Sequence, residues 1–320
     1  MNILVTGAAG FIGSHVCEHL IERGNLIIGI DNFDGFYSKR IKQLNLENLH
    51  SNPKFNFYEG DLREKDFLSS VFSSIDIDVV IHLAAKAGVR PSIESISEYY
   101  EVNVNGTVNL LEAMKANGTT KMLFASSSSI YGNNEKVPFS ESDRVDNPIS
   151  PYASTKKSGE LLCYVYTHLY QFDITCLRFF TVYGPRQRPD LAIHKFTRLI
   201  DEGLPLPFYG DGSTSRDYTY IDDIIDGIDC ALRNLKGYHI YNLGESSVIN
   251  LRTLVETIEN LLQKKAVLKK LPLQPGDVNT TFADISKARE EIGYAPKMDI
   301  ETGISEFINW YKKNKSFLYA

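Results

Sequence analysis

Cysteine, tryptophan and long apolar runs are all scarce in this chain. Of its 320 residues, four are cysteine and one is tryptophan. The cysteines are widely spaced, at Cys17, Cys163, Cys176 and Cys230. They form no Cys-x-x-Cys pair and have no histidine at a ligand spacing, so neither a disulfide framework nor a zinc site is indicated. We expect reduced thiols, a cytoplasmic protein and no bound metal.

The chain also lacks a membrane segment and a strong positive charge. No uncharged apolar run approaches the ~20 residues that a membrane-spanning helix needs. The formal net charge is -6, which argues against general binding to nucleic acids or membrane surfaces but allows a local basic pocket. We expect no nucleic-acid and no membrane partner. At roughly 100–200 residues per domain, the length suits two domains or one large α/β unit.

A glycine-rich turn opens the chain. The apolar run 2–6 predicts a buried strand and residues 14–23 have helical spacing, while Gly7, Gly10 and Gly13 lie between them. Strand, glycine turn and helix together are typical of dinucleotide binding, because glycines let the backbone approach a pyrophosphate that the helix N-terminus attracts. The spacing is Gly-x-x-Gly-x-x-Gly, which differs from that of many dehydrogenases.

A second predicted strand, 26–31, ends in Asp31. This residue follows the glycines by about twenty residues, where a carboxylate can accept hydrogen bonds from an adenosine ribose. A carboxylate would repel a 2′-phosphate, and no arginine is adjacent, so NAD is favoured over NADP. The alternative is an ordinary turn residue at the end of a strand.

Strands and helices continue to alternate. Further strands are predicted at 55–58, 78–82 and 122–126, with helices near 64–74, 97–117 and 151–170. This alternation predicts an α/β fold: a Rossmann-type doubly wound parallel sheet with a smaller α/β C-terminal substrate lobe. We expect an NAD-binding domain at 1–178 plus about 217–247, and a substrate-binding lobe at 179–216 and 248–320.

Tyr152 and Lys156 stand four residues apart, on one face of the predicted helix 151–170. A free tyrosine titrates near ~10 and is a poor base at neutral pH. A nearby ammonium lowers that pKa, so a tuned tyrosine can take a proton from a sugar or alcohol hydroxyl. Alone this pattern is weak, because a solvated helix face can carry the same two residues.

Several motifs together resemble the extended short-chain dehydrogenase/reductase family, in particular its nucleotide-sugar epimerases. The resemblance covers nearly the whole chain and is carried by Gly7-x-x-Gly10-x-x-Gly13, Asp61-Leu62-Arg63, His82-Leu83-Ala84-Ala85, Asn103-Val104-Asn105-Gly106-Thr107, Ser126-Ser127-Ser128-Ser129-Ile130-Tyr131-Gly132 and Tyr152-x-x-x-Lys156. It implies that Tyr152 is the acid/base, that Ser127 hydrogen-bonds the reacting hydroxyl, and that Lys156 holds the nicotinamide ribose.

The resemblance also implies the contacts of the cofactor and the form of the assembly. The residues expected to bind NAD are Gly7, Gly10, Phe11, Ile12, Gly13, Asp31, Asn32, Asp61, Leu62, Ala84, Ala85, Lys86, Asn103, Tyr152 and Lys156. A homodimer is expected through the helices near 97–117 and 151–170, as in the family.

The implied reaction is epimerisation at C4 of a UDP-sugar through a 4-keto intermediate. Sugar 4,6-dehydratases usually have Asp-Glu after the catalytic threonine, where this chain has Ser128 and Ser129. Uronate decarboxylases usually have an acid at the position of Ser129. Both alternatives are weakened, and so is a non-catalytic NAD-binding regulator, since such relatives commonly lose the Tyr-x-x-x-Lys pair.

Residues in the second half favour a uronate as the sugar. Neutral-hexose epimerases usually have Asn where Thr181 stands and Arg where Gln274 stands. The stretch around Thr181 and Arg188, like Arg90 with Ser92, is similar to UDP-glucuronate 4-epimerases, which implies conversion of UDP-glucuronate to UDP-galacturonate. UDP-glucose and UDP-N-acetylglucosamine remain alternatives. The residues expected to bind substrate are Arg90, Ser127, Ser128, Thr181, Arg188, Arg216 and Asp277.

Overall fold

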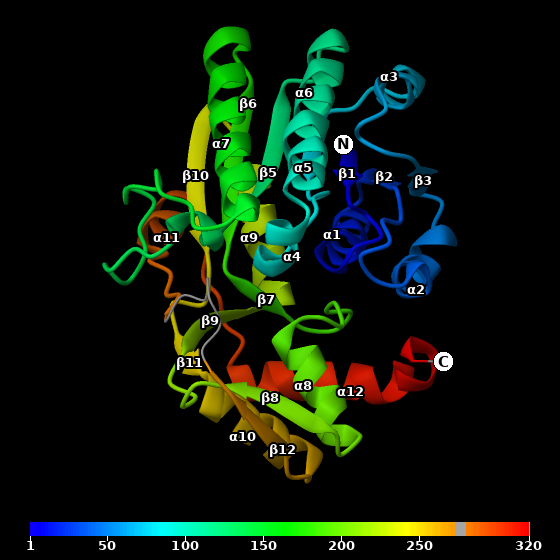
Figure 1. Cartoon of the computed structure of the whole chain (residues 1–320). Coiled ribbons are helices and arrows are strands. Elements are labelled where there is room, and N and C mark those ends of the chain that lie inside the picture. Colours follow the sequence, from blue (N-terminus) through cyan, green and yellow to red (C-terminus); the bar gives the residue numbers. More distant parts are fainter. Residues whose placement is uncertain (273–279, 320) are drawn as a thin grey trace.

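A seven-stranded parallel sheet forms the centre of the molecule, which is described by a computed structural model over residues 1–272 and 280–319 (Figure 1). The strands lie in the order β10-β6-β5-β4-β1-β2-β3. The strand order reverses between β1 and β4, the point at which open sheets of this kind bind their ligands. The strands are β1 (Asn2–Thr6), β2 (Leu26–Asp31), β3 (Phe55–Glu59), β4 (Val79–His82), β5 (Lys121–Ser127), β6 (Asp173–Phe179) and β10 (Tyr238–Leu243).

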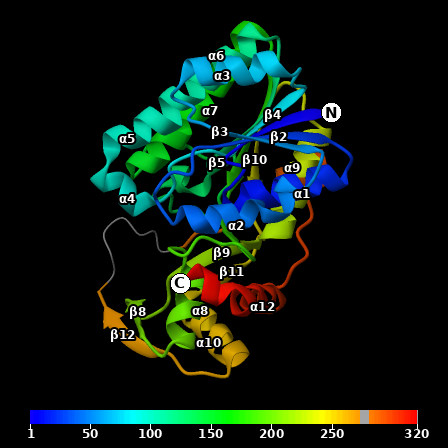
Figure 2. The ribbon, with the colours of Figure 1, turned by 90° about the vertical axis from the view of Figure 1, so that its right-hand side faces the viewer.

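Helices cover both faces of this sheet, which confirms the doubly wound fold expected from the sequence (Figure 2). One face carries α1 (Phe11–Glu22), α2 (Lys39–His50) and α9 (Ile221–Arg233), and the other carries α3 (Lys65–Ser74), α6 (Gly106–Ala116) and α7 (Pro151–Tyr170). Each layer encloses its own apolar cluster. Because both faces are covered, strands such as β1 are apolar along their length rather than alternating.

The segment predicted as one helix near 97–117 is interrupted. It consists of α5 (Ile96–Tyr100), a π-helical turn (Glu101–Asn105) and α6, and a short helix α4 (Val89–Glu94) precedes it. A one-turn 3₁₀ helix (Ser128–Tyr131) follows β5. These irregular turns lie beside the carboxyl ends of β4 and β5, and such turns are frequent at functional sites.

A smaller lobe lies below the sheet in Figure 1. It contains a three-stranded sheet of β7 (Thr181–Tyr183), β9 (Ser215–Tyr220) and β11 (Val248–Asn250), and a two-stranded sheet of β8 (Pro205–Tyr209) and β12 (Val267–Leu271). Its helices are α8 (Ala192–Asp201), α10 (Leu251–Leu262) and α12 (Ile300–Leu318). A further helix, α11 (Ser286–Ile292), packs on β10. Within the described ranges, every helix is too short or too polar to span a bilayer.

Candidate active site

A cavity of about 500 Å³ opens at the carboxyl ends of the central strands and extends to the smaller lobe. Most of the residues singled out in the sequence line it: Gly7, Gly10, Phe11, Ile12, Gly13, Asp31, Asn32, Asp61, Leu62, Ala84, Ala85, Lys86, Ser127, Ser128, Tyr152, Lys156, Thr181, Arg188 and Arg216. Asn103 and Arg90 are not part of the lining, and Asp277 and Gln274 lie outside the described residues.

The glycine turn forms a close-packed cradle at one end of the cavity. Gly7 has φ 73°, and a Cβ on it would lie 2.9 Å from the backbone nitrogen of Ala84. A Cβ on Gly13 would lie 2.0 Å from the carbonyl oxygen of Gly7. Helix α1 starts after Gly10 without a side-chain cap, so its first N–H groups face the cavity end unpaired by any side chain. The cradle therefore fits the pyrophosphate of a dinucleotide.

Asp31 ends β2 with its carboxylate already oriented. Its oxygens accept hydrogen bonds from the N–H groups of Ala9 (3.1 Å) and Phe33 (2.8 Å), and the ammonium of Lys42 lies 3.9 Å away. Burial raises the pKa of Asp31, while Lys42 and the two N–H groups oppose that effect. A carboxylate held in this way can accept a hydrogen bond from a ribose hydroxyl at the cavity wall.

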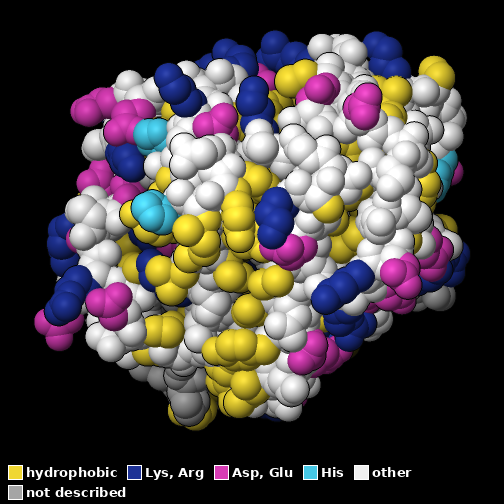
Figure 3. All heavy atoms as spheres, turned by 90° about the horizontal axis from the view of Figure 1, so that it is seen from above, with side chains coloured by type: hydrophobic (Ala, Val, Ile, Leu, Met, Phe, Trp, Pro, Cys, Tyr) yellow, Lys and Arg dark blue, Asp and Glu magenta, His cyan; other side chains and the backbone are white. Residues whose placement is uncertain are grey.

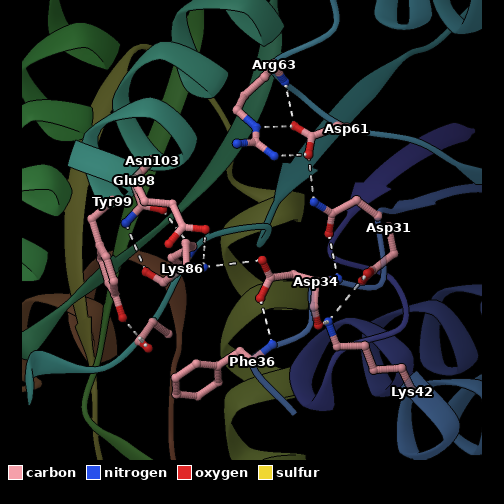
Figure 4. A network of polar contacts seen from close by, with 12 residues as sticks. Asp31, Asp34, Phe36, Lys42, Asp61, Arg63, Lys86, Glu98, Tyr99 and Asn103 are labelled. Atoms are coloured by element: carbon pink, nitrogen blue, oxygen red, sulfur yellow. Dashed lines mark hydrogen bonds and ion pairs between the residues drawn. The ribbon is translucent and has the colours of Figure 1, made fainter. Parts of the chain in front are cut away.

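Asp61 lies next along the same end of the cavity and is held from two sides (Figure 4). Arg63 donates two side-chain hydrogen bonds to it, at 3.0 and 2.8 Å, and Asn32 donates a third at 2.8 Å. The hydrogen bonds from Arg63 are the main reason that the pKa of Asp61 falls to about 2. Asp61 is therefore a charged acceptor at neutral pH.

Lys86 lines the cavity and bridges two acidic residues (Figure 4). Its ammonium lies 2.6 Å from Glu98 and 3.4 Å from Asp34. Asn103 lies behind Lys86: its amide accepts from the Lys86 N–H (2.8 Å) and donates to the Lys86 carbonyl (3.0 Å) and to Thr155 (3.0 Å). Asn103 thus fixes the loop after β4 to helix α7 without reaching the cavity surface.

Tyr152, from α7, and Ser127, from the end of β5, both line the cavity. Burial raises the pKa of Tyr152 above its ordinary value, and hydrogen bonding from Ser127 and the charge of Arg188 offset this only in part. The ring of Tyr99 packs edge-on against Tyr152, with ring centroids 6.3 Å apart. Ser127 also accepts a hydrogen bond from the Ser129 N–H at 3.2 Å. The hydroxyl groups of Ser127 and Tyr152 are therefore both available to a hydroxyl group of a molecule bound in the cavity.

Lys156 lies one turn after Tyr152 on α7, but its ammonium points to the sheet. It donates to the carbonyl oxygen of Ala125 at 2.7 Å and lies 6.0 Å from the centroid of the Tyr152 ring. Burial lowers the pKa of Lys156 to about 8. Ser127 and Arg188, rather than this lysine, are therefore the groups that lower the pKa of Tyr152 in the structure.

The smaller lobe completes the wall opposite the sheet. Arg188 forms a two-point ion pair with Asp190, at 3.0 and 2.8 Å, and lies 5.1 Å from the centroid of the Phe36 ring. Thr181 and Arg216 line the same wall, and Arg216 donates to the Ser215 carbonyl at 2.8 Å. Arg90 lies away from the lining, with its guanidinium 5.6 Å from the Tyr209 ring centroid.

Sequence reasoning missed the loop after β2 and the start of α2. Asp34, Phe36, Tyr37 and Lys42 all line the cavity. The sequence pattern of α2 could have identified Lys42, because this residue has the helical spacing of the buried positions Asn45, Leu46 and Leu49. A lysine on a buried stripe is rarely without a functional or ionic partner. Among the described residues, no group of three or more potential metal ligands was found.

Comparisons with known proteins agree with this geometry. The GDP-mannose 4,6 dehydratase family matches residues 4–307. A protein named UDP-glucuronate 4-epimerase from Thermodesulfobacterium geofontis is 45% identical over 97% of this chain and 96% of its own. The structure of UDP-glucuronic acid 4-epimerase from Bacillus cereus, with UDP-glucuronic acid and NAD, has a TM-score of 0.92 and 40% identity, covering 98% of this chain and 99% of that one. A UDP-glucose 4-epimerase from Thermotoga maritima has a TM-score of 0.90 and 33% identity, with 98% and 100% covered.

Proposed function

Because this chain belongs to the GDP-mannose 4,6 dehydratase family of extended short-chain dehydrogenases/reductases, we propose that it catalyses the NAD-dependent C4 epimerisation of UDP-glucuronate to UDP-galacturonate. The observation that carries the proposal is that Ser127 and Tyr152 line the same cavity as the dinucleotide cradle of Gly7, Gly10 and Gly13. The epimerases named above support the choice of reaction and of substrate.

NAD would be held by the cradle of Gly7 and Gly13, by Asp31 at the adenosine ribose, and by Lys156 at the nicotinamide ribose. When bound, NAD supplies a reversible hydride acceptor at C4 of the sugar. Lys42 and Lys86 add positive charge at the cofactor end. The Lys42 ammonium contacts the Asp31 carboxylate and the Asp34 carbonyl, and the Lys86 ammonium contacts the Asp34 carboxylate. These partners keep the two ammonium groups in place before the cofactor arrives.

The proton transfer belongs to Tyr152 and Ser127. Tyr152 as the phenolate takes the proton of the sugar 4-hydroxyl, and Ser127 donates a hydrogen bond to the resulting keto oxygen. After the 4-keto sugar turns about its diphosphate linkage, Tyr152 returns the proton on the other face. The two residues act on one oxygen in both halves of the reaction, so no second acid is needed.

The carboxylates of the cavity argue against elimination. Among the described lining residues these are Asp31, Asp34 and Asp61: Asp31 ends β2, Asp34 follows it, and Asp61 follows β3. Ser128 and Ser129 stand beside Ser127 instead of an acid. A 4,6-elimination needs an acid and a base at the sugar. Among the described lining residues, no carboxylate lies next to Ser127 in the sequence to serve as either.

A uronate fits the wall formed by Thr181 and Arg188. The guanidinium of Arg188 is already paired with Asp190, so it offers a weaker attraction to the sugar carboxylate than an unpaired arginine would. Weak attraction suits an epimerase, because a strong salt bridge would hinder rotation of the 4-keto sugar. It also avoids fixing the β-keto acid in one geometry, which limits loss of carbon dioxide.

A homodimer in the cytoplasm completes the proposal. Helix α7 carries an exposed apolar row, with Leu161, Tyr164, Val165 and Leu169 exposed by 55, 54, 43 and 59%. Hydrophobic side chains gather in a stripe with charged side chains around it when the molecule is viewed from above (Figure 3). Large exposed apolar patches mark interaction sites. The four cysteines are unpaired thiols, as a reducing compartment requires.

An assay of purified protein over a panel of UDP-sugars tests this proposal. We expect UDP-glucuronate and UDP-galacturonate to interconvert without added NADH. We expect UDP-glucose and UDP-N-acetylglucosamine to react slowly or not at all, and UDP-xylose to form slowly or not at all. Efficient conversion of UDP-glucose with no reaction of UDP-glucuronate would contradict the choice of substrate. Sedimentation of the protein and of Leu161→Glu tests the dimer, since a charge in the apolar row should give a monomer.

A further inference from the structure

Behind the catalytic residues lies a buried ion pair that the reaction does not use. Glu160 is on α7, one turn after Lys156, and Arg178 is on β6; both side chains are 1% exposed. Arg178 donates two hydrogen bonds to the Glu160 carboxylate, at 2.9 and 3.0 Å. Burial raises the pKa of Glu160, but Arg178 outweighs this effect and keeps the pKa below its usual range. The pair is therefore ionised in the interior.

This pair is attached to both ends of the serine run that contains Ser127. Before Ser127, the hydroxyl of Ser126 donates to Glu160 at 2.7 Å. After it, Arg178 donates to the hydroxyl of Tyr131 at 2.8 Å, and that hydroxyl donates to Asn242 on β10 at 2.7 Å. The segment from Ser126 to Tyr131, which contains Ser127 and the 3₁₀ turn Ser128–Tyr131, is thus attached at both ends to one guanidinium–carboxylate pair.

The same pair also fixes helix α7. Glu160 is on the helix that carries Tyr152 and Lys156, and the Glu160 carbonyl accepts a hydrogen bond from Tyr238 on β10 at 3.0 Å. A shift of α7 against β5 or β6 would break the two-point bond, because a planar guanidinium fits a carboxylate in one orientation. One buried network therefore links the element that carries the phenol to the element that carries the serine hydroxyl.

We propose that Glu160, Arg178 and Tyr131 are positioning residues that hold the Ser127 hydroxyl against the Tyr152 hydroxyl. The assignment of Ser127 and Tyr152 to the reaction rests on the proposed function. The positioning residues touch neither cavity nor substrate, since none of the three lines the cavity. A misplacement of about 1 Å at a reacting group can lower the rate about 100-fold, so such a network has a measurable effect on turnover.

Tyr131→Phe is the sharpest variant, because it keeps the ring that stacks on Phe139 and removes one hydroxyl. We expect kcat for UDP-glucuronate to fall about tenfold or more, with KM and NAD affinity within about threefold of the unchanged protein. The phenol of Tyr152 should titrate at higher pH in the NAD complex, because its bond to Ser127 is loosened. The apparent pKa of the acidic limb in the pH profile of kcat should increase by a similar amount.

Tyr294→Phe is the matched control, since it also removes a buried tyrosine hydroxyl, one that donates to the Gly244 carbonyl at 2.9 Å. A second variant, Glu160→Met with Arg178→Met, replaces the ion pair by apolar side chains and avoids a lone buried charge. If either Tyr131→Phe or this double variant keeps both the kcat and the Tyr152 titration of the unchanged protein, the positioning role is wrong.

The titration separates this inference from the proposed function. The pH-dependent phenolate absorbance of each protein, minus that of the same protein carrying Tyr152→Phe, reports Tyr152 alone and needs no sugar. If the unchanged protein converts no UDP-sugar, the proposed function fails while the titration still decides the positioning role. A titration that moves upward in Tyr131→Phe and stays in Tyr294→Phe supports that role; no difference between the two overturns it.

Discussion

The two ends of the cavity are built in different ways. At the cofactor end, polar side chains follow β2, β3 and β4, and several of their partners face solvent: Arg63 is 46% and Glu98 is 46% exposed. At the reaction end, Ser127, Tyr152 and Lys156 come from β5 and α7, and the ion pair behind them is 1% exposed. The first end relies on backbone shape and many solvated contacts, the second on a few buried ones.

This difference sets the size of the effects that single substitutions should have. A solvated charge pair is typically worth about 0.2–1 kcal/mol, because water and salt screen it. Removing one partner of a buried pair costs about 3–5 kcal/mol. We therefore expect large effects where the chain touches the reacting atoms or packs backbone on backbone, and small effects from solvated side chains at the cofactor end.

The largest effect is expected at the reaction end, from Tyr152→Phe. This change removes the hydroxyl that we propose accepts and returns the proton, and general acid–base groups contribute about 10²–10⁴-fold to a rate. We expect kcat to fall by that amount, while NAD binding, measured by fluorescence titration, changes by less than about threefold. Tyr164→Phe, exposed on the same helix, is the control. Full turnover in Tyr152→Phe would remove the basis of the mechanism.

Gly13→Ala tests whether backbone shape dominates the cofactor end. The added Cβ would lie 2.0 Å from the Gly7 carbonyl oxygen, and such overpacking costs about 1–3 kcal/mol. Expressed as NAD affinity, this corresponds to roughly a tenfold to hundredfold loss, measured by calorimetry. Gly35→Ala, where a Cβ has no neighbour within 4 Å, should bind NAD nearly as well. Equal binding by both variants would contradict the role of the cradle.

At the cofactor end, several of the residues that line the cavity follow from local sequence patterns. Gly7, Gly10, Gly13 and Asp31 are close in sequence and follow a recognisable strand-turn-helix pattern, so local rules located them. The parallel sheet followed from the alternation of elements, and the structure confirms it. The interruption at 101–105 was not predicted, because a π-helical turn keeps the apolar spacing of the surrounding helix within a residue.

At the reaction end, the directions of the side chains and the contacts between elements could not be predicted from sequence spacing. Tyr152 and Lys156 were found together, but the spacing alone could not show that the Lys156 ammonium turns to the Ala125 carbonyl. That direction depends on the packing of α7 against β5. The link between Glu160 and Arg178 was invisible for the same reason, since the partners belong to different elements and are joined by tertiary packing. Lys42 was missed because its partner Asp31 belongs to the preceding strand.

The protonation of Lys156 gives an intermediate effect. Its pKa of about 8 means that the ammonium, which should hold the nicotinamide ribose, is lost as the pH rises through that value. Arginine stays charged, so Lys156→Arg provides the reference at each pH. Relative to Lys156→Arg, we expect the kcat of the unchanged protein to decline above pH 8 by up to about tenfold for each further pH unit. The same pH dependence of kcat in both proteins would contradict this assignment.

Arg63→Met should have the smallest effect, because it removes a solvated partner at the cofactor end. Arg63 is the main cause of the low pKa of Asp61, about 2 in the folded protein against an ordinary value near ~3.9. A lowered carboxyl pKa stabilises the fold above the ordinary value, and this stability is lost as the pH falls through the folded one. At pH 7 we expect Arg63→Met to lower the free energy of unfolding by less than about 1 kcal/mol, measured by urea denaturation. The difference from the unchanged protein should shrink as the pH falls through about 2 and vanish below it, since Asp61 is then protonated in both. A loss at pH 7 as large as that of a buried pair would erase the contrast between the two ends of the cavity.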